Sequence, residues 1–149
     1  MEETILTKLH SEHLDIEHDL DLIIRTQNES VKQELFAQVK RKLVEHMEGE
    51  ENSIYRHFRE DIKDGRNLHF VLTSDSEHHS IKEYLQRLTL LDIKSERWQE
   101  SLKELARIIK EHVADEEDEM FAEAKEDFSK EELIQFGTEF ENLKSHSIL

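Results

Sequence analysis

The sequence predicts an all-α protein: an up-down-up-down bundle of four long helices, with a short fifth helix at the C-terminus. The 149 residues include no proline and only three glycines, so turns and hairpins lack their usual residues. Residues that favour helix, such as Glu, Lys and Leu, are abundant. Apolar residues recur at spacings of three and four, which is typical of amphipathic helices. Because the connections between the long helices are short, neighbouring helices are expected to be antiparallel.

The breaks in the helical pattern define the elements. The predicted helices cover residues 2–27, 31–63, 67–91, 95–127 and 130–144. The first break is at residues 27–30, where Ser30 and Gln33 have the spacing of a capping box for the second helix. The next is at residues 63–67, where Gly65 suits the left-handed residue that commonly ends a helix.

The last two breaks complete the plan. Residues 91–96 form a weaker break, and Ser129 with Glu132 has the spacing of a second capping box, at the start of the fifth helix. A chain of this length is long enough to bury a core of its own. We therefore expect one domain over residues 1–149.

Charge and composition argue against several classes of protein. The formal net charge of -16 disfavours nucleic acid or an anionic membrane as a partner, since both require a positively charged surface. No apolar run is long enough for a transmembrane helix, and the N-terminus lacks the apolar run of a signal peptide. The chain has no cysteine, which excludes disulfides and thiolate sites. These features predict a cytoplasmic protein that uses neither nucleic acid nor membrane.

One pattern occurs twice along the chain. The segment "HMEGEENSIYRHF" at residues 46–58 is matched by "HVADEEDEMFAEA" at residues 112–124, each with His, then Glu-Glu from the fourth place, then an apolar–aromatic pair. Upstream, "EHLDIEHDLDLI" at residues 12–23 is similarly matched by "EHHSIKEYLQRL" at residues 77–88. We interpret the chain as two helical hairpins built on the same plan. Internal repeats of this kind often form a site on their shared axis.

Polar residues interrupt each apolar stripe near the middle of its helix. They are His13, His46, Glu50, His78, His112 and Glu116. At 1.5 Å per residue, all six fall at similar heights in an antiparallel bundle. Two buried carboxylates require positive charge, yet no Lys or Arg occupies the stripes near this level. Imidazole with carboxylate suits iron, manganese or zinc, so we predict that these six residues bind metal.

Residues near these stripes leave alternatives open. His10 lies close to the inner face of the first helix and is an alternative to His13, which we prefer because it matches the repeated Glu-His-x-x-Ile pattern. Glu51 and Glu117 flank the predicted ligands and either accept hydrogen bonds from them or are solvated. Tyr55 is expected to cover the site as a packing residue.

The sequence resembles the hemerythrin-like, or HHE cation-binding, family. The resemblance rests on "LHSEH", "HMEGEENSIY", "EHHSI", "HVADEEDEMF" and the tail "FSKEELIQFG". It implies a non-heme di-iron centre inside a four-helix bundle, with an oxo, hydroxo or exogenous ligand between the two irons. Carried over to this chain, it implies one iron on His13 and His46 and the other on His78 and His112. Glu50 and Glu116 would bridge the two irons.

Two positions differ from the oxygen-carrying hemerythrins. Lys82 stands four residues after His78, where the oxygen-carrying hemerythrins have His. Glu117 stands five residues after His112, where they have Asp. The pattern is closer to the four-His, two-Glu version of iron–sulfur cluster repair proteins and of an iron-sensing ubiquitin-ligase subunit. Fewer protein ligands leave coordination positions open, which favours reaction with small molecules.

We therefore predict a protein that binds two iron ions and binds or reacts with a small diatomic or peroxide ligand, namely O2, NO or peroxide. Its role would be that of a sensor, an iron-handling protein or a repair accessory. One alternative is a di-iron oxidoreductase with peroxidase- or catalase-like activity. Another is a metal-free helical interaction module.

Overall fold

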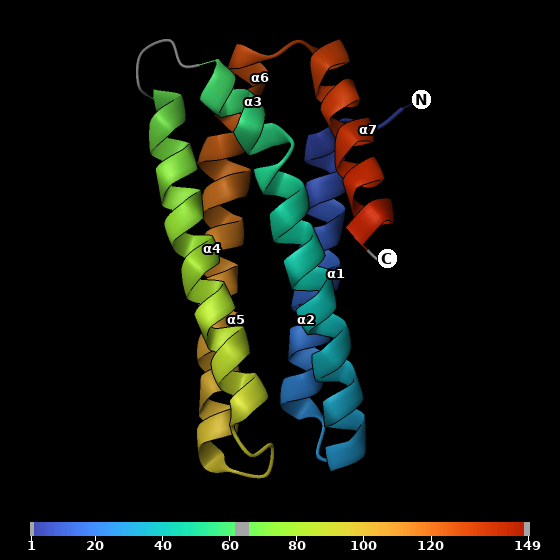
Figure 1. Cartoon of the computed structure of the whole chain (residues 1–149), viewed down its shortest axis with the longest axis vertical. Coiled ribbons are helices and arrows are strands. Elements are labelled where there is room, and N and C mark those ends of the chain that lie inside the picture. The colour runs from blue at the N-terminus through green and yellow to red at the C-terminus, as the bar shows by residue number, and fades with distance from the viewer. Residues whose placement is uncertain (1, 62–65, 148–149) are drawn as a thin grey trace.

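The computed structural model describes residues 2–61 and 66–147 and confirms the predicted all-α bundle. The elements are α1 (Ile5–Arg25), α2 (Glu29–Glu51), α3 (Ile54–Glu60), α4 (Arg66–Leu90), α5 (Glu96–Asp115), the π-helix η1 (Glu116–Met120), α6 (Phe121–Asp127) and α7 (Lys130–Ser147). Figure 1 shows α1, α2, α4 and α5 running side by side along the long axis. The C-terminal helix α7 packs against α1 and α2. Among the described residues, no helix is both long and apolar enough to cross a membrane.

Two of the predicted long helices are interrupted at their Glu-Glu pair: α2 ends with Glu51, and η1 begins with Glu116. The structure has two helices, α2 and α3, in place of the predicted helix 31–63. In place of the predicted helix 95–127 it has α5 and α6 with the π-helix η1 between them. In the first interruption Ser53 departs from helical geometry (φ -125°, ψ -96°). Its hydroxyl donates a 2.6 Å hydrogen bond to the carbonyl of Gly49, a contact that often bends helices. π-Helical turns are frequent at functional sites. Both halves of the repeat thus have irregular backbone next to the six predicted metal ligands. We call the level of the bundle at which these six residues lie the polar layer.

The helix caps agree with the sequence in one case and differ in another. The cap of α2 is Asn28, whose side chain accepts a backbone N–H at 3.1 Å, so the prediction of Ser30 is wrong. Asn and Ser cap helices about equally well, and the residue earlier in the chain does so here. The predicted box of Ser129 and Glu132 is confirmed by reciprocal hydrogen bonds of 2.9 and 3.1 Å. The predicted helix end at Gly65 lies outside the described residues.

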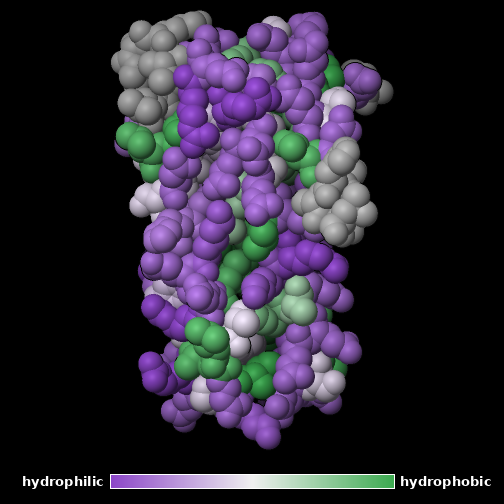
Figure 2. Space-filling model, in the orientation of Figure 1, coloured by the Kyte–Doolittle hydropathy of each residue, from purple (hydrophilic) through white to green (hydrophobic). Residues whose placement is uncertain are grey.

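The apolar core consists of two clusters that lie on either side of the polar layer. One cluster includes Leu20, Leu88 and Trp98 and fills the half of the bundle near the α1–α2 and α4–α5 turns. The other includes Phe58 and Phe140 and joins α3 and α7 to the bundle. The face seen in Figure 2 is mostly hydrophilic, with an apolar seam near its middle. The polar layer is therefore enclosed by apolar packing along the bundle axis.

Gly49 allows α7 to pack directly on α2, and alanine there is expected to destabilise the fold. A Cβ at Gly49 would lie 2.6 and 2.8 Å from ring atoms of the fully buried Phe140. Glycine to alanine inside a helix ordinarily stabilises by about 1 kcal/mol. Here Gly49→Ala should instead cost about 1–3 kcal/mol through overpacking. Thermal melts should show a Tm lower by roughly 3–10 °C.

A second substitution provides the control for this prediction. Phe140→Leu removes the ring atoms that the new methyl group would meet, so the double variant Gly49→Ala/Phe140→Leu should melt no lower than Phe140→Leu alone. A Tm of Gly49→Ala above that of the unmodified protein would contradict the assigned contact.

Candidate metal centre

The six residues that the sequence singles out lie together in the middle of the bundle. Each has at most 3 % of its surface exposed. Their ligand atoms form two groups within which all atoms lie within 4.8 Å of one another. One group contains His13, His46, Glu50 and Glu116, and the other contains Glu50, His78, His112 and Glu116. The two glutamates are therefore common to both groups, and each group has two histidines of its own.

Each glutamate lies between a histidine of the first hairpin and a histidine of the second. Glu50 Oε1 is 3.3 Å from His46 Nε2 and 3.2 Å from His78 Nε2. Glu116 Oε1 is 3.1 Å from His13 Nε2 and 3.3 Å from His112 Nε2. The histidines of one group are stacked edge to face, with 4.9 Å between the ring centroids of His13 and His46. The same distance separates the rings of His78 and His112. A carboxylate in such a position can bridge two ions.

Most of the ligand atoms in this layer have no hydrogen bond. They are Nε2 of His13, His46 and His112, both carboxylate oxygens of Glu50, and Oε1 of Glu116. Buried polar atoms without partners are costly and rare. Cations placed between them would satisfy these atoms together, and the donor set of imidazole and carboxylate suits iron, manganese or zinc. The residues present therefore fit metal ions.

The other ring nitrogen of each histidine is held by a carboxylate. The four Nδ1 atoms lie 2.7–3.1 Å from a glutamate oxygen. The pairs are His13 with Glu117, His46 with Glu12, His78 with Glu51, and His112 with Glu77. A carboxylate that accepts the Nδ1 proton fixes the tautomer that leaves Nε2 free for a metal and increases its basicity.

Two of these four acceptors were candidates in the sequence and two were not. Glu51 and Glu117 were expected either to accept hydrogen bonds or to be solvated, and the first is confirmed. Glu12 and Glu77 were missed, although each directly precedes a predicted ligand. The repeated Glu-His and Glu-Glu dipeptides were the signal that could have identified all four.

The buried acids and bases perturb one another. Burial lowers the pKa of the His112 imidazole, but the surrounding carboxylates, Glu116 foremost, raise that pKa well above its usual value. Burial raises the pKa of the Glu116 carboxyl, but His112 and its other neighbours hold it well below the usual range. The pKa of His46 is likewise raised by Glu50 against the effect of burial. Attraction between imidazole and carboxylate thus outweighs the effect of burial on the pKa of His46, His112 and Glu116. Because metal binds the neutral imidazole, binding should depend on pH.

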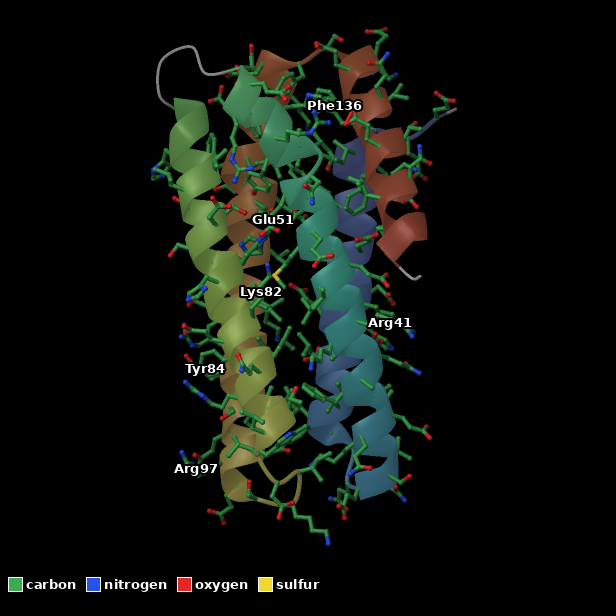
Figure 3. All side chains as sticks on the ribbon, in the orientation of Figure 1. Arg41, Glu51, Lys82, Tyr84, Arg97 and Phe136 are labelled. Atoms are coloured by element: carbon green, nitrogen blue, oxygen red, sulfur yellow. The ribbon has the colours of Figure 1, made fainter. Side chains whose placement is uncertain are left out.

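The remaining candidates lie around this layer. The ring of His10 is 52 % exposed and contacts Glu117 at 2.7 Å, so the structure places His13 and not His10 in the layer. Tyr55 is buried as expected, but it does more than pack, because its hydroxyl donates to Glu116 Oε2 at 2.7 Å. Lys82 lies 3.7 Å from Glu51 across the interface of α2 and α4 (Figure 3).

Comparisons with known proteins agree with a metal centre. The family model described as "Hemerythrin HHE cation binding domain" matches residues 4–124, a range that contains all six residues. The chain is also 28 % identical over 113 residues to a protein named "DNA nickase" from Nostoc sp. (strain PCC 7120), a match that covers 76 % of this chain and 31 % of that protein. The chain thus spans about a third of the length of this curated relative. No solved structure matches.

Proposed function

The chain belongs to the hemerythrin HHE cation-binding domain family, and on that premise we propose that it binds two iron ions, which bind or react with O2, NO or peroxide. His13 and His46 would hold one ion and His78 and His112 the other. Glu50 and Glu116 would bridge them. The observation that carries the proposal is the set of buried ligand atoms without hydrogen bonds, which gather into two groups sharing both carboxylates. When bound, a pair of iron ions supplies redox change and open coordination positions.

The chain's own residues would orient and enclose this pair. The four carboxylates at Nδ1 hold the imidazole rings in place. The hydroxyl of Tyr55 holds one oxygen of Glu116 and leaves the other free of hydrogen bonds. The two apolar clusters keep water from the layer along the bundle axis.

A small cavity beside the histidines has a lining that suits an apolar diatomic ligand better than a polar one. It has a volume of about 10 Å³, near the minimum for a single water molecule, so it has no room for an organic substrate. Its lining consists of the rings of three histidines together with Ile16, Leu43, Met47, Ile81, Ile109 and Val113. Because apolar walls offer water no hydrogen bonds, this space favours O2 or NO over peroxide.

Metal analysis and an optical spectrum test the proposal. Protein purified in air without chelator should contain about two iron ions per chain and absorb in the near ultraviolet as oxo-bridged ferric pairs do. O2 or NO added to the reduced protein should give a stoichiometric spectral change. Less than about half an equivalent of iron, manganese or zinc would exclude metal binding and leave the interaction module. Steady turnover of peroxide would favour the oxidoreductase.

Filling the apolar cavity should separate metal binding from ligand binding. Ile81→Phe places a larger side chain in the cavity wall and should slow the reaction of the iron-loaded protein with NO about tenfold, with iron content unchanged. Leu85→Phe, one turn further along α4, is buried but does not line the cavity, so it controls for overpacking. Equal NO rates in the two variants would argue against this cavity as the ligand site.

The proposal does not extend to DNA. The match to the Nostoc protein covers 31 % of that protein, and the net charge of -16 opposes binding to a phosphate backbone. The cytoplasmic location expected from the cysteine-free composition remains part of the proposal.

A further inference from the structure

The two halves of the repeat differ in what covers the polar layer from outside. On the first hairpin, α7 packs against α1 and α2 (Figure 1). Its Phe140 contacts Gly49 and lies with its ring centroid 6.2 Å from that of His46. Its Lys144 forms an ion pair with Glu12. The C-terminal helix therefore closes this side of the layer and neutralises one of the supporting carboxylates.

The equivalent positions of the second hairpin border a cavity. In the repeat, Asp115 corresponds to Gly49, and Glu77 corresponds to Glu12. Both line a cavity of about 200 Å³ between α3, α4 and η1, together with Glu119. Where the first hairpin has a phenylalanine and a lysine from α7, the second has an open, acidic space.

This cavity reaches from the surface to one of the proposed metal ligands, Glu116. Asp115 and Glu119 in its wall are exposed, and Glu77 is half-buried. Tyr55 and Glu116 also line it and are 2 and 3 % exposed. Glu116 has a carboxylate oxygen without a hydrogen bond. A cation moving inward would thus pass exposed carboxylates and meet an unsatisfied buried one.

We propose that this acidic cavity is the route by which a divalent cation reaches the metal centre. The inference rests on the proposed function, because it requires that the buried layer binds metal. Clefts lined by charge of one sign raise the local concentration of the opposite ion and accelerate its association by about 10- to 1000-fold. An uncharged diatomic ligand gains nothing from these carboxylates, so the acidic lining is specific to the cation.

Uptake of Co2+ by metal-free protein, followed by stopped-flow visible absorption, tests the route. The variant Asp115→Asn/Glu119→Gln should take up Co2+ about tenfold more slowly at low ionic strength, with the same final Co2+ content. The difference should largely vanish at roughly 0.5 M salt. Glu34→Gln/Glu100→Gln makes the same change in net charge at exposed positions near the opposite end of the bundle and should leave the rate unchanged.

A steric variant keeps the proposal testable independently of charge. Thr73 is half-buried in the cavity wall, and Thr73→Phe should slow Co2+ uptake at every salt concentration. Equal uptake rates in both charge variants, with normal final Co2+ content, would overturn the route and leave the proposed function intact. Lower Co2+ content at equilibrium in Asp115→Asn/Glu119→Gln would also overturn it, because these carboxylates would then be part of the binding site. Failure of the unmodified protein to bind Co2+ would overturn both.

Discussion

Replacing Glu50 with alanine is expected to remove both metal ions, whereas replacing His46 with alanine should remove one. Glu50 belongs to both groups of ligand atoms, and its Oε1 lies 3.3 Å from His46 and 3.2 Å from His78. His46 belongs to a single group. Metal analysis should therefore fall from about two equivalents to below about half for Glu50→Ala, and to about one equivalent for His46→Ala.

Loss of both ions should also lower thermal stability. A ligand at 1000 times its dissociation constant stabilises the folded state by about 4 kcal/mol, and 1 kcal/mol shifts the Tm of a domain of this size by roughly 2–4 °C. With two ions lost, about 8 kcal/mol of stabilisation is lost, so Glu50→Ala should melt roughly 16–32 °C below the loaded, unmodified protein. The unmodified protein after treatment with chelator provides the control and should show a comparable drop. Retention of two equivalents by Glu50→Ala would contradict the bridging role.

The sequence was sufficient for the fold and for the six central residues because both depend on periodicity. Four amphipathic stripes with short connections admit few arrangements other than an antiparallel bundle. A histidine or glutamate in such a stripe faces the core whatever the details of packing, so His78 or Glu116 could be assigned to one level by counting residues. The same counting could not separate His10 from His13 outright, because both lie near the inner face. The structure separates them by burial: the ring of His10 is half exposed and His13 is buried.

The features that sequence reasoning missed depend on contacts between elements. Gly49 has no obvious purpose within α2 until Phe140 of α7 lies against it. The π-helix η1 contains neither proline nor glycine, so no residue type marks it. Glu12 and Glu77 lie one position away from the apolar stripe and look like ordinary surface carboxylates. The repeated Glu-His dipeptide marks them, but the contact that each makes with the histidine of the neighbouring helix follows from the packing of the helices.

The second prediction concerns the four carboxylates that contact Nδ1 of the histidines. Which two of them are substituted together should decide how the metal is released. Glu12 and Glu117 contact His46 and His13, which we assign to one ion. Glu77 contacts His112, which we assign to the other. Loss of such a partner typically costs 10- to 100-fold in metal affinity. Glutamine keeps the shape and an acceptor oxygen but removes the charge, so we expect about a tenfold loss for each affected partner.

Two double variants with the same number of substitutions should therefore differ. Glu12→Gln/Glu117→Gln removes both charges behind one ion, so one equivalent of metal should be lost at a chelator concentration about 100-fold lower than in the unmodified protein, while the second equivalent is retained. Glu12→Gln/Glu77→Gln weakens each ion once, so both equivalents should be lost together at about tenfold lower chelator concentration. Titration of Zn2+-loaded protein with a chromogenic chelator measures both curves. Identical curves would mean that the carboxylates act on the centre as a whole, because only carboxylates assigned to individual ions can turn a single release step into two.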